Sequence, residues 1–428
     1  MFVSFTVQNA YSFYDAQTLS ARAVKTCKER QDEATFKPFE DKDGRLVKAL
    51  AIYGANASGK SNIFYALADM RQTVLASANG AQSGDRIAVM PFLFGGEGAS
   101  RPSSYTLEFV LDGLQYKYGY SATPESVVGE YLVRKGSRGR VYKELFSRSV
   151  VDGENRINCD KSFAADKLVI SRTRTNALFL STCAMLAVPE AERIIDYFAR
   201  KLRVIPADHM TSGFTAKMLG DGRHRRQIGD FLKMTDPGIG DITVESFSRE
   251  TENILPDGTR EVSTGYEPRV NPVMRDGSVS DKKIPLLAIA SLGTVKAFNL
   301  AAHIFDALET GAVLMLDELD SRLHPLLTRE IIRLFNSAET NPRNAQLVFN
   351  THDTNLLGVR VYNPGLDRSV YLLRRDEIYF VEKNGEMCSK IYSLIDFKKA
   401  GCSVRKDASY EKDYLAGLYG AIPYIGKM

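Results

Sequence analysis

The stretch LVKALAIYGANASGKSNIFYAL at residues 46–67 decides the fold of this chain. Residues 46–53 are mostly apolar and typical of a buried strand, and residues 59–77 carry apolar side chains at helical spacing. Between them, the run from Gly54 to Ser61 fits the pattern GxxxxGK[ST] in full. A strand, a glycine-rich turn and a helix N-terminus together form a unit that holds phosphates. The stretch therefore predicts an α/β fold with a phosphate-binding loop.

The residue types in this loop have chemical reasons to be there. Glycines allow backbone N–H groups to close around a β-phosphate, Lys60 is expected to reach the β- and γ-phosphates, and Ser61 is expected to ligate Mg²⁺. The alternative is a glycine-rich structural turn, which the full match to the pattern disfavours. The residues predicted to bind ATP in this loop are Gly54, Asn56, Ala57, Ser58, Gly59, Lys60, Ser61 and Asn62.

A second apolar strand ends in two acids. Residues 312–316 read AVLML and are followed directly by Asp317 and Glu318, as in a Walker B strand that delivers carboxylates to the carboxyl edge of a parallel sheet. Asp317 is predicted to hold Mg²⁺, and Glu318 is predicted to polarise the water that attacks ATP. Such a strand can be purely structural when it occurs alone. Its pairing with the phosphate-binding loop favours the catalytic interpretation.

The segments that follow this strand resemble the ABC-type ATPases of the SMC, RecF and OLD branch. Asp320 in the run LDSRLHP resembles their D-loop and Leu-His-Pro turn, with Pro325 opening a helix. His352, at the end of the run QLVFNTHD, resembles their switch histidine. The resemblance implies catalytic roles for Asp320 and His352. It also implies a P-loop NTPase fold with an ABC-type ATPase head. A histidine at a strand end is, by itself, more often structural.

The run ASLGT at residues 290–294 resembles the ABC signature that precedes Walker B. Ser291 and Gly293 match Leu-Ser-Gly-Gly-Gln, whereas a leucine and a threonine replace one glycine and the glutamine. This version, together with residues 405–407 and 414–423, resembles the RloA and abortive-infection group of AAA family ATPases from anti-phage defence operons. The resemblance implies that Ser291 and Gly293 bind ATP held by a second copy. The result is a homodimer or higher homo-oligomer closed by an ATP sandwich. An ordinary helix N-cap is the alternative.

Patterns elsewhere predict the elements around this head. Alternation over residues 105–149 predicts an antiparallel β meander, residues 160–235 are expected to be mainly helical, and residues 240–280 are expected to form hairpins. We therefore expect four segments, namely an N-terminal ATPase lobe with the meander (1–155), a helical insertion (156–240), a β-hairpin region (241–283) and a C-terminal ATPase lobe (284–428). The weakly alternating residues 2–7 are expected to form an edge strand.

Composition limits the candidate partners. The 56 basic and 52 acidic residues nearly balance at a net charge of +4, which does not by itself indicate a nucleic-acid-binding protein. Nucleic acid remains a candidate partner at two basic stretches, residues 134–143 and 217–226, where a solvated face or a protein docking surface is the alternative. Five scattered cysteines and the lack of a long apolar run predict a cytoplasmic protein that has no membrane partner.

These features predict an ATP-binding and ATP-hydrolysing protein that acts as a nucleotide-dependent switch or sensor in anti-phage defence. The catalytic residue types found in the chain all serve one nucleotide site, so the effector is expected to be a separate polypeptide. The family resemblance names a Toprim-type nuclease as that effector. A RecF-like DNA-repair ATPase and a non-hydrolysing ATP-dependent scaffold are the alternatives, and Glu318 argues against the scaffold.

Overall fold

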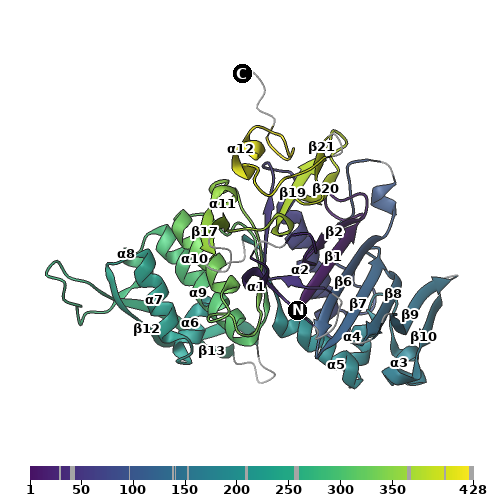
Figure 1. The fold of residues 1–428 in the computed structure, drawn as a ribbon. Coiled ribbons are helices and arrows are strands. Elements are labelled where there is room, and N and C mark those ends of the chain that lie inside the picture. The colour runs from purple at the N-terminus through teal and green to yellow at the C-terminus, as the bar shows by residue number, and fades with distance from the viewer. Residues whose placement is uncertain are drawn as a thin grey trace.

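Two large sheets and the helices around them form a mixed α/β fold, which confirms the α/β prediction (Figure 1). The computed structural model describes residues 1–27, 30–38, 44–95, 97–136, 139, 141–151, 154–207, 211–254, 260–363, 368–399 and 402–423. Within these residues no helix combines the length and apolar character needed to span a membrane.

The central sheet is parallel except at one edge. Its six strands lie in the order β11 (Leu202–Ile205), β15 (Val313–Leu316), β16 (Gln346–Asn350), β5 (Ala49–Tyr53), β19 (Ile378–Lys383) and β20 (Ser389–Ser393). Only β20 runs antiparallel to its neighbour. The strand after Walker B, β16, lies between β15 and β5. The carboxyl ends of β5, β15 and β16 therefore meet at one edge of the sheet.

Alternate residues of β5 enter two different cores, which explains why the strand is apolar throughout. Leu50 and Ile52 pack in the core that contains helix α2 (Lys60–Ala76) and the antiparallel sheet. Ala51 and Tyr53 pack in the core that contains α9 (Leu292–Thr310) and α10 (Pro325–Asn336). A parallel strand that is covered on both faces has no solvent side on which polar residues are favoured.

The second sheet is antiparallel and lies beyond α2 (Figure 1). Its seven strands lie in the order β10 (Glu154–Cys159), β9 (Lys143–Val151), β8 (Val127–Lys135), β7 (Leu114–Ala122), β6 (Ser103–Leu111), β1 (Phe2–Gln8) and β2 (Gln17–Ser20). The predicted meander over residues 105–149 is confirmed by β6 to β9. The prediction that residues 2–7 form an edge strand is wrong, because β1 pairs with both β2 and β6. Phe2, Phe5 and Val7 are buried in the core. The polar residues between them gave the strand the alternating pattern from which an edge position was predicted.

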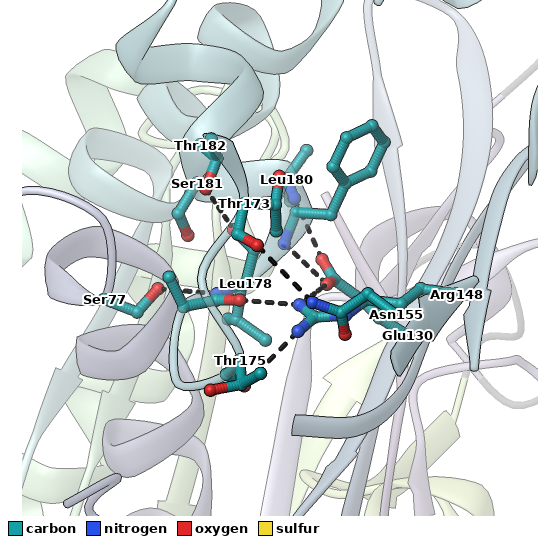
Figure 2. A network of polar contacts seen from close by, with 12 residues as sticks. Ser77, Glu130, Arg148, Asn155, Thr173, Thr175, Leu178, Leu180, Ser181 and Thr182 are labelled. Atoms are coloured by element: carbon teal, nitrogen blue, oxygen red, sulfur yellow. Dashed lines mark hydrogen bonds and ion pairs between the residues drawn. The ribbon is translucent and has the colours of Figure 1, made fainter. Parts of the chain in front are cut away.

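A buried ion pair within the antiparallel sheet, between β8 and β9, lies near the far end of α2 (Figure 2). The carboxylate of Glu130 accepts a hydrogen bond from the backbone N–H of Leu180, at 2.9 Å, and lies 3.6 Å from the guanidinium of Arg148. Neither side chain of this pair is exposed to solvent. Next to them, the N–H of Leu178 donates to Oγ of Ser77, which follows the last residue of α2. The far end of the helix that begins at the glycine-rich loop is therefore bonded to the segment that precedes α4 (Phe179–Met185).

The stretch predicted to be mainly helical contains a strand of the central sheet. Helices α3 (Lys167–Arg172), α4 (Phe179–Met185), α5 (Pro189–Asp196), α6 (Gly213–Gly220) and α7 (Arg225–Thr235) are present. Between α5 and α6, however, β11 pairs with β15 in parallel. Four residues are too few to show a strand period beside a long helical one, so tertiary pairing decides this element. The borders of the four expected segments remain a prediction.

Two hairpins complete the chain. Strands β12 (Ile239–Ile254) and β13 (Arg260–Pro272) form a long ribbon that projects away from the antiparallel sheet, and β14 (Ile284–Pro285) pairs with β13 (Figure 1). After β16, strands β17 (Arg360–Asn363) and β18 (Arg368–Tyr371) form the second hairpin. The chain continues through the 3-10 turn η6 (Arg375–Glu377), then β19 and β20, to α12 (Tyr410–Leu415). The smaller elements are α1 (Gln31–Ala34), β3 (Thr35–Phe36), β4 (Leu46–Val47), α8 (Leu286–Ile289), α11 (Asn355–Gly358), β21 (Lys398–Lys399) and β22 (Cys402–Ser403).

Candidate active site

The glycine-rich loop joins β5 to the N-terminus of α2, as its sequence predicts. Gly59 is the N-cap residue of α2, with a left-handed φ of 104°, and no side chain caps the helix there. A Cβ at this position would lie 2.5 Å from Oγ of Ser12 and still closer to Oγ of Ser389, so only glycine fits. The backbone N–H groups at the start of this 17-residue helix are thus left for an anion, which fits the predicted phosphate site.

Two serines from distant segments brace the loop. Ser389, at the start of β20, donates a hydrogen bond of 2.6 Å to the carbonyl of Ser58. Its Oγ lies 2.7 Å from Oγ of Ser12, which in turn accepts a 2.8 Å hydrogen bond from the amide of Asn62. No sequence motif indicated Ser12 or Ser389, because an isolated serine in a turn or strand matches no motif.

Lys60 is the first residue of α2, and its side chain folds back onto the glycine-rich loop. Its ammonium donates to the carbonyls of Gly54 and Ala55, at 2.8 and 2.9 Å. Burial lowers the pKa of Lys60 to about 8, while the negative charges of the nearby acids 317, 318 and 320 act in the opposite direction. The remaining two predicted residues, Asn56 and Ala57, are exposed at the loop tip, where Ala57 has a φ of 61°.

The predicted magnesium ligands lie together at the edge of the central sheet. The hydroxyl of Ser61 donates to Oδ1 of Asp317 at 3.0 Å, and Asp317 is 1% exposed. A hydroxyl beside a carboxylate is the oxygen donor set that Mg²⁺ takes when phosphates and water supply its other ligands. The amide of Asn350 also donates to the Asp317 carboxylate. Asn350 ends the strand β16 and was not among the predicted site residues.

Glu318 follows Asp317 in a strained conformation. Its φ of 53° lies in the left-handed region, which costs a residue other than glycine on the order of 1 kcal/mol. Both of its backbone polar groups are held, because its N–H donates to Oδ1 of Asn350 and its carbonyl accepts from the ammonium of Lys296 at 3.2 Å. Lys296 lies in α9 and is a second residue that the sequence motifs did not indicate. These two contacts fix the backbone from which the predicted catalytic carboxylate projects.

Asp320 and the backbone of His352 contact each other. The backbone N–H of His352 donates to Oδ2 of Asp320 at 3.1 Å. Partial burial lowers the pKa of the His352 imidazole, and the charge of Lys60 lowers it further. The imidazole is therefore mainly neutral at pH 7, with one nitrogen that donates and one that accepts.

The signature segment makes contacts of its own at the start of α9. Ser291 is the N-cap of α9, and its hydroxyl accepts a 3.1 Å hydrogen bond from the N–H of Thr294. Among the described residues, no hydrogen bond joins Ser291 to the glycine-rich loop. A Cβ at Gly293 would lie 2.7 Å from the carbonyl of Arg322, so the start of α9 packs closely on the segment after Glu318. The helix-cap alternative therefore describes Ser291 within a single chain.

The two basic stretches are largely engaged in ion pairs within the chain. The pairs join Arg134 to Glu190, Lys143 to Asp160, Arg223 to Asp306, Arg225 to Asp241 and Arg226 to Asp230. Arg138 and Arg140 of the first stretch lie outside the described residues. A cation that already pairs with a carboxylate gains less free energy from binding a nucleic-acid phosphate. The ion pairs therefore favour a solvated face or a protein docking surface over a nucleic-acid groove.

Comparison with protein families places this site in a known class. Residues 50–160 and 234–358 match the family model described as "AAA domain, putative AbiEii toxin, Type IV TA system". The chain belongs to this family. The two matched segments contain the glycine-rich loop, the signature segment, Walker B and the switch histidine, so the site described above belongs to a nucleotide-binding ATPase domain. A comparison with curated proteins gave no match.

Proposed function

We propose that this protein is an ABC-type ATPase in which Lys60, Asp317 and Glu318 form one catalytic site. The contact between Ser61 and Asp317 carries the proposal, because it joins segments 256 residues apart at the point where β- and γ-phosphates would lie. The acids 317, 318 and 320 all act electrostatically on Lys60, so the opposite charges needed for phosphoryl chemistry converge there. The family match supports ATP as the substrate.

Each residue has a role that its surroundings favour. Lys60 and the N–H groups at the start of α2 bind and orient the phosphates, and Ser61 and Asp317 would hold Mg²⁺. When bound, Mg²⁺ supplies positive charge that neutralises the phosphate oxygens. Glu318 takes the proton of the attacking water, since its backbone is fixed by Asn350 and Lys296. The neutral imidazole of His352 is suited to hydrogen-bond a γ-phosphate oxygen.

The test of hydrolysis uses Glu318→Gln, which keeps the shape of the side chain and removes its basicity. Steady-state phosphate release should fall by about a hundredfold or more, while ATP binding is retained. Lys60→Ala should lose ATP binding itself. Glu339→Gln is a matched control, because Glu339 is exposed at the end of the α10 region and away from the site. Unchanged phosphate release in Glu318→Gln would refute the catalytic assignment and would favour a non-hydrolysing scaffold.

We further propose that ATP is held between two copies of the chain. Ser291 and Gly293 lie at an exposed helix start with apolar neighbours, since Leu287, Ile289 and Leu292 are 67%, 48% and 65% exposed. Apolar surface of this kind around a polar motif is typical of an interaction site. Closure and opening of this interface would change the surface that the protein presents to a partner, which is the logic of a nucleotide switch.

The biological role that we propose is the control of a separate effector in anti-phage defence. One support is the family description, which names a putative AbiEii toxin of a type IV TA system. The other is that the catalytic residue types recognised in the sequence all belong to one nucleotide site. Phage plating on cells that carry this gene, the neighbouring gene or both, each with and without Glu318→Gln, tests the role. Protection should need both genes and Glu318. Protection by this gene alone, independent of Glu318, would contradict it.

A further inference from the structure

A basic cavity lies away from the nucleotide site, between the β17–β18 hairpin and the start of α12. Its volume is about 140 Å³, and its charged lining consists of Arg360, Arg374, Arg375, Lys406 and Asp407. Arg375, which lines the cavity, is the first residue of η6, and η6 directly precedes β19. Because β19 runs parallel to β5, the cavity lies at the amino edge of the central sheet. The glycine-rich loop lies at the carboxyl edge.

The ion pairs at the cavity do not neutralise all of its cationic side chains, so its lining has a net positive charge. Arg374 is buried and forms a bidentate pair with Asp376, at 2.7 and 2.9 Å, so the charge at the floor is matched. The carboxylate of Asp407 is engaged by Arg405, which projects to solvent. Among the described residues, no carboxylate pairs with Arg360 or Lys406. The cavity thus presents two uncompensated cations beside a neutralised floor.

Hydrogen bonds hold the two walls of the cavity together. Arg375 donates to the carbonyl of Val404 at 2.7 Å, and the hydroxyl of Tyr371 donates to the carbonyl of Ala408 at 2.8 Å. These bonds fix the segment that carries Lys406 against the hairpin. The cavity is therefore defined by the tertiary structure and does not depend on a chance approach of two loops.

Arg360 is oriented before any ligand arrives. Its guanidinium carbon lies 4.4 Å from the centroid of the Tyr371 ring, and one N–H group donates to the Tyr371 hydroxyl at 3.1 Å. Stacking on an aromatic face fixes the plane of the guanidinium and leaves its other N–H groups available. A planar donor set held in this way matches the oxygens of a phosphoryl group.

We propose that this cavity is a second anion site, which binds a single phosphoryl group through Arg360 and Lys406. Its volume is below the range of about 300–1,000 Å³ typical of pockets for whole drug-sized ligands, so a nucleotide does not fit inside it. The phosphoryl group is either free phosphate or the terminal phosphate of a larger molecule such as a nucleic-acid strand. This site does not depend on the proposed ATPase function, because it shares no residue with the glycine-rich loop.

The test measures binding to the full-length chain that carries Lys60→Ala, so that the nucleotide loop does not contribute. Inorganic phosphate is titrated by calorimetry. A six-nucleotide thymidine strand with a 5′-phosphate is compared with the same strand with a 5′-hydroxyl by fluorescence anisotropy. Arg360→Met and Lys406→Met should each weaken phosphate binding by about tenfold or more, since each removes a charge-assisted hydrogen bond. Lys412→Met is the matched control, and it should leave binding unchanged because Lys412 is exposed on α12 and is not among the lining residues of the cavity.

The outcomes separate the sources of the phosphoryl group. Binding of inorganic phosphate alone supports a free anion, and a preference for the 5′-phosphorylated strand that Arg360→Met removes supports a terminal phosphate. Arg360→Lys keeps the charge without the planar fork and should lose part of the affinity. Equal binding by the parent, Arg360→Met and Lys406→Met, with unchanged melting temperatures, would overturn the proposal. Strand binding that ignores the 5′-phosphate, together with no binding of inorganic phosphate, would also overturn it.

Discussion

Two regions of the molecule differ in how many of their contacts a single chain supplies. One is the corner formed by the glycine-rich loop together with Asp317, Glu318 and Asn350, and the other is the signature segment at residues 290–294. At the corner, Asp317 after β15 is contacted by Ser61 of α2 and by Asn350 of β16, and Ser389 of β20 contacts the loop. At the signature segment, the hydroxyl of Ser291 is used by its own helix and the next residue, Leu292, is 65% exposed. A single chain therefore assembles the residues that we propose to bind phosphate and Mg²⁺. It only displays the segment that a second copy would use.

The largest expected effect tests whether Ser291 does more than cap its helix. Aspartate is as good an N-cap as serine, so Ser291→Asp should keep α9 intact while its carboxylate repels the phosphates of a nucleotide held by a second copy. We expect ATP turnover to fall to the background rate, with an unchanged melting temperature. Turnover equal to that of the parent protein would reduce Ser291 to a structural cap.

Subunit mixing extends the same test. A heterodimer of Ser291→Asp and Lys60→Ala chains would contain one composite site in which both halves are unchanged. Phosphate release should then partly recover on mixing, provided that the subunits exchange. Mixing two preparations of the Ser291→Asp chain is the control, and it should show no recovery.

The next effect concerns Asn350, which connects the two acids of the corner. Asn350→Ala removes the donor to Asp317 and the acceptor for the Glu318 N–H. Loss of a residue that orients metal and catalytic groups typically costs about ten- to a hundredfold, and we expect turnover to fall within this range. Asn355→Ala is the control, because the Asn355 side chain bonds only to the neighbouring Asp353 among the described residues. A full-rate Asn350→Ala enzyme would show that the corner does not need this connection.

A smaller effect is expected from pH. We propose that Lys60 binds phosphate in its protonated form, and burial lowers the pKa of Lys60 to about 8. The ammonium is therefore mostly present below pH 8 and is lost as the pH rises through this value. The affinity for ATP should fall by roughly tenfold between pH 7 and pH 9, as measured by equilibrium binding. Lys60→Arg, whose guanidinium stays protonated, should show a flat profile over the same range.

The smallest effect is expected at Lys296, which connects the signature helix to Glu318 within one chain. Lys296 lies one turn into α9 from the signature segment and donates to the carbonyl of Glu318. Lys296→Met should lower kcat by about fivefold through a misplaced Glu318, while KM for ATP stays unchanged. Lys296→Arg should restore most of the rate. A change in KM alone would place Lys296 in nucleotide binding and would show that the signature helix does not position Glu318.

The difference between the two regions also explains which site residues the sequence indicated. Gly59 and Lys60 follow one another in a motif, because phosphate binding at a helix start needs several consecutive backbone positions. Asp317 and Glu318 are visible for a similar reason, since they end a strand that is apolar on both faces. Ser12, Ser389 and Asn350 support the same corner one at a time from separate segments. A single polar residue in a strand or turn has no spacing that could identify it.

The sequence alone predicted the α/β class, the phosphate-binding loop, the acid-bearing strand and the antiparallel meander. Each of these features shows as a local pattern, either in the spacing of apolar residues or in the residue types of a motif. The tertiary structure alone decided the pairing of β11 with β15, the interior position of β1, and the bracing of the loop by Ser12 and Ser389. It also decided the cavity around Arg360. The physical reason is that these features arise from contacts between segments far apart in the chain. Their free energy depends on the packing of both partners, and a local pattern records only one of them.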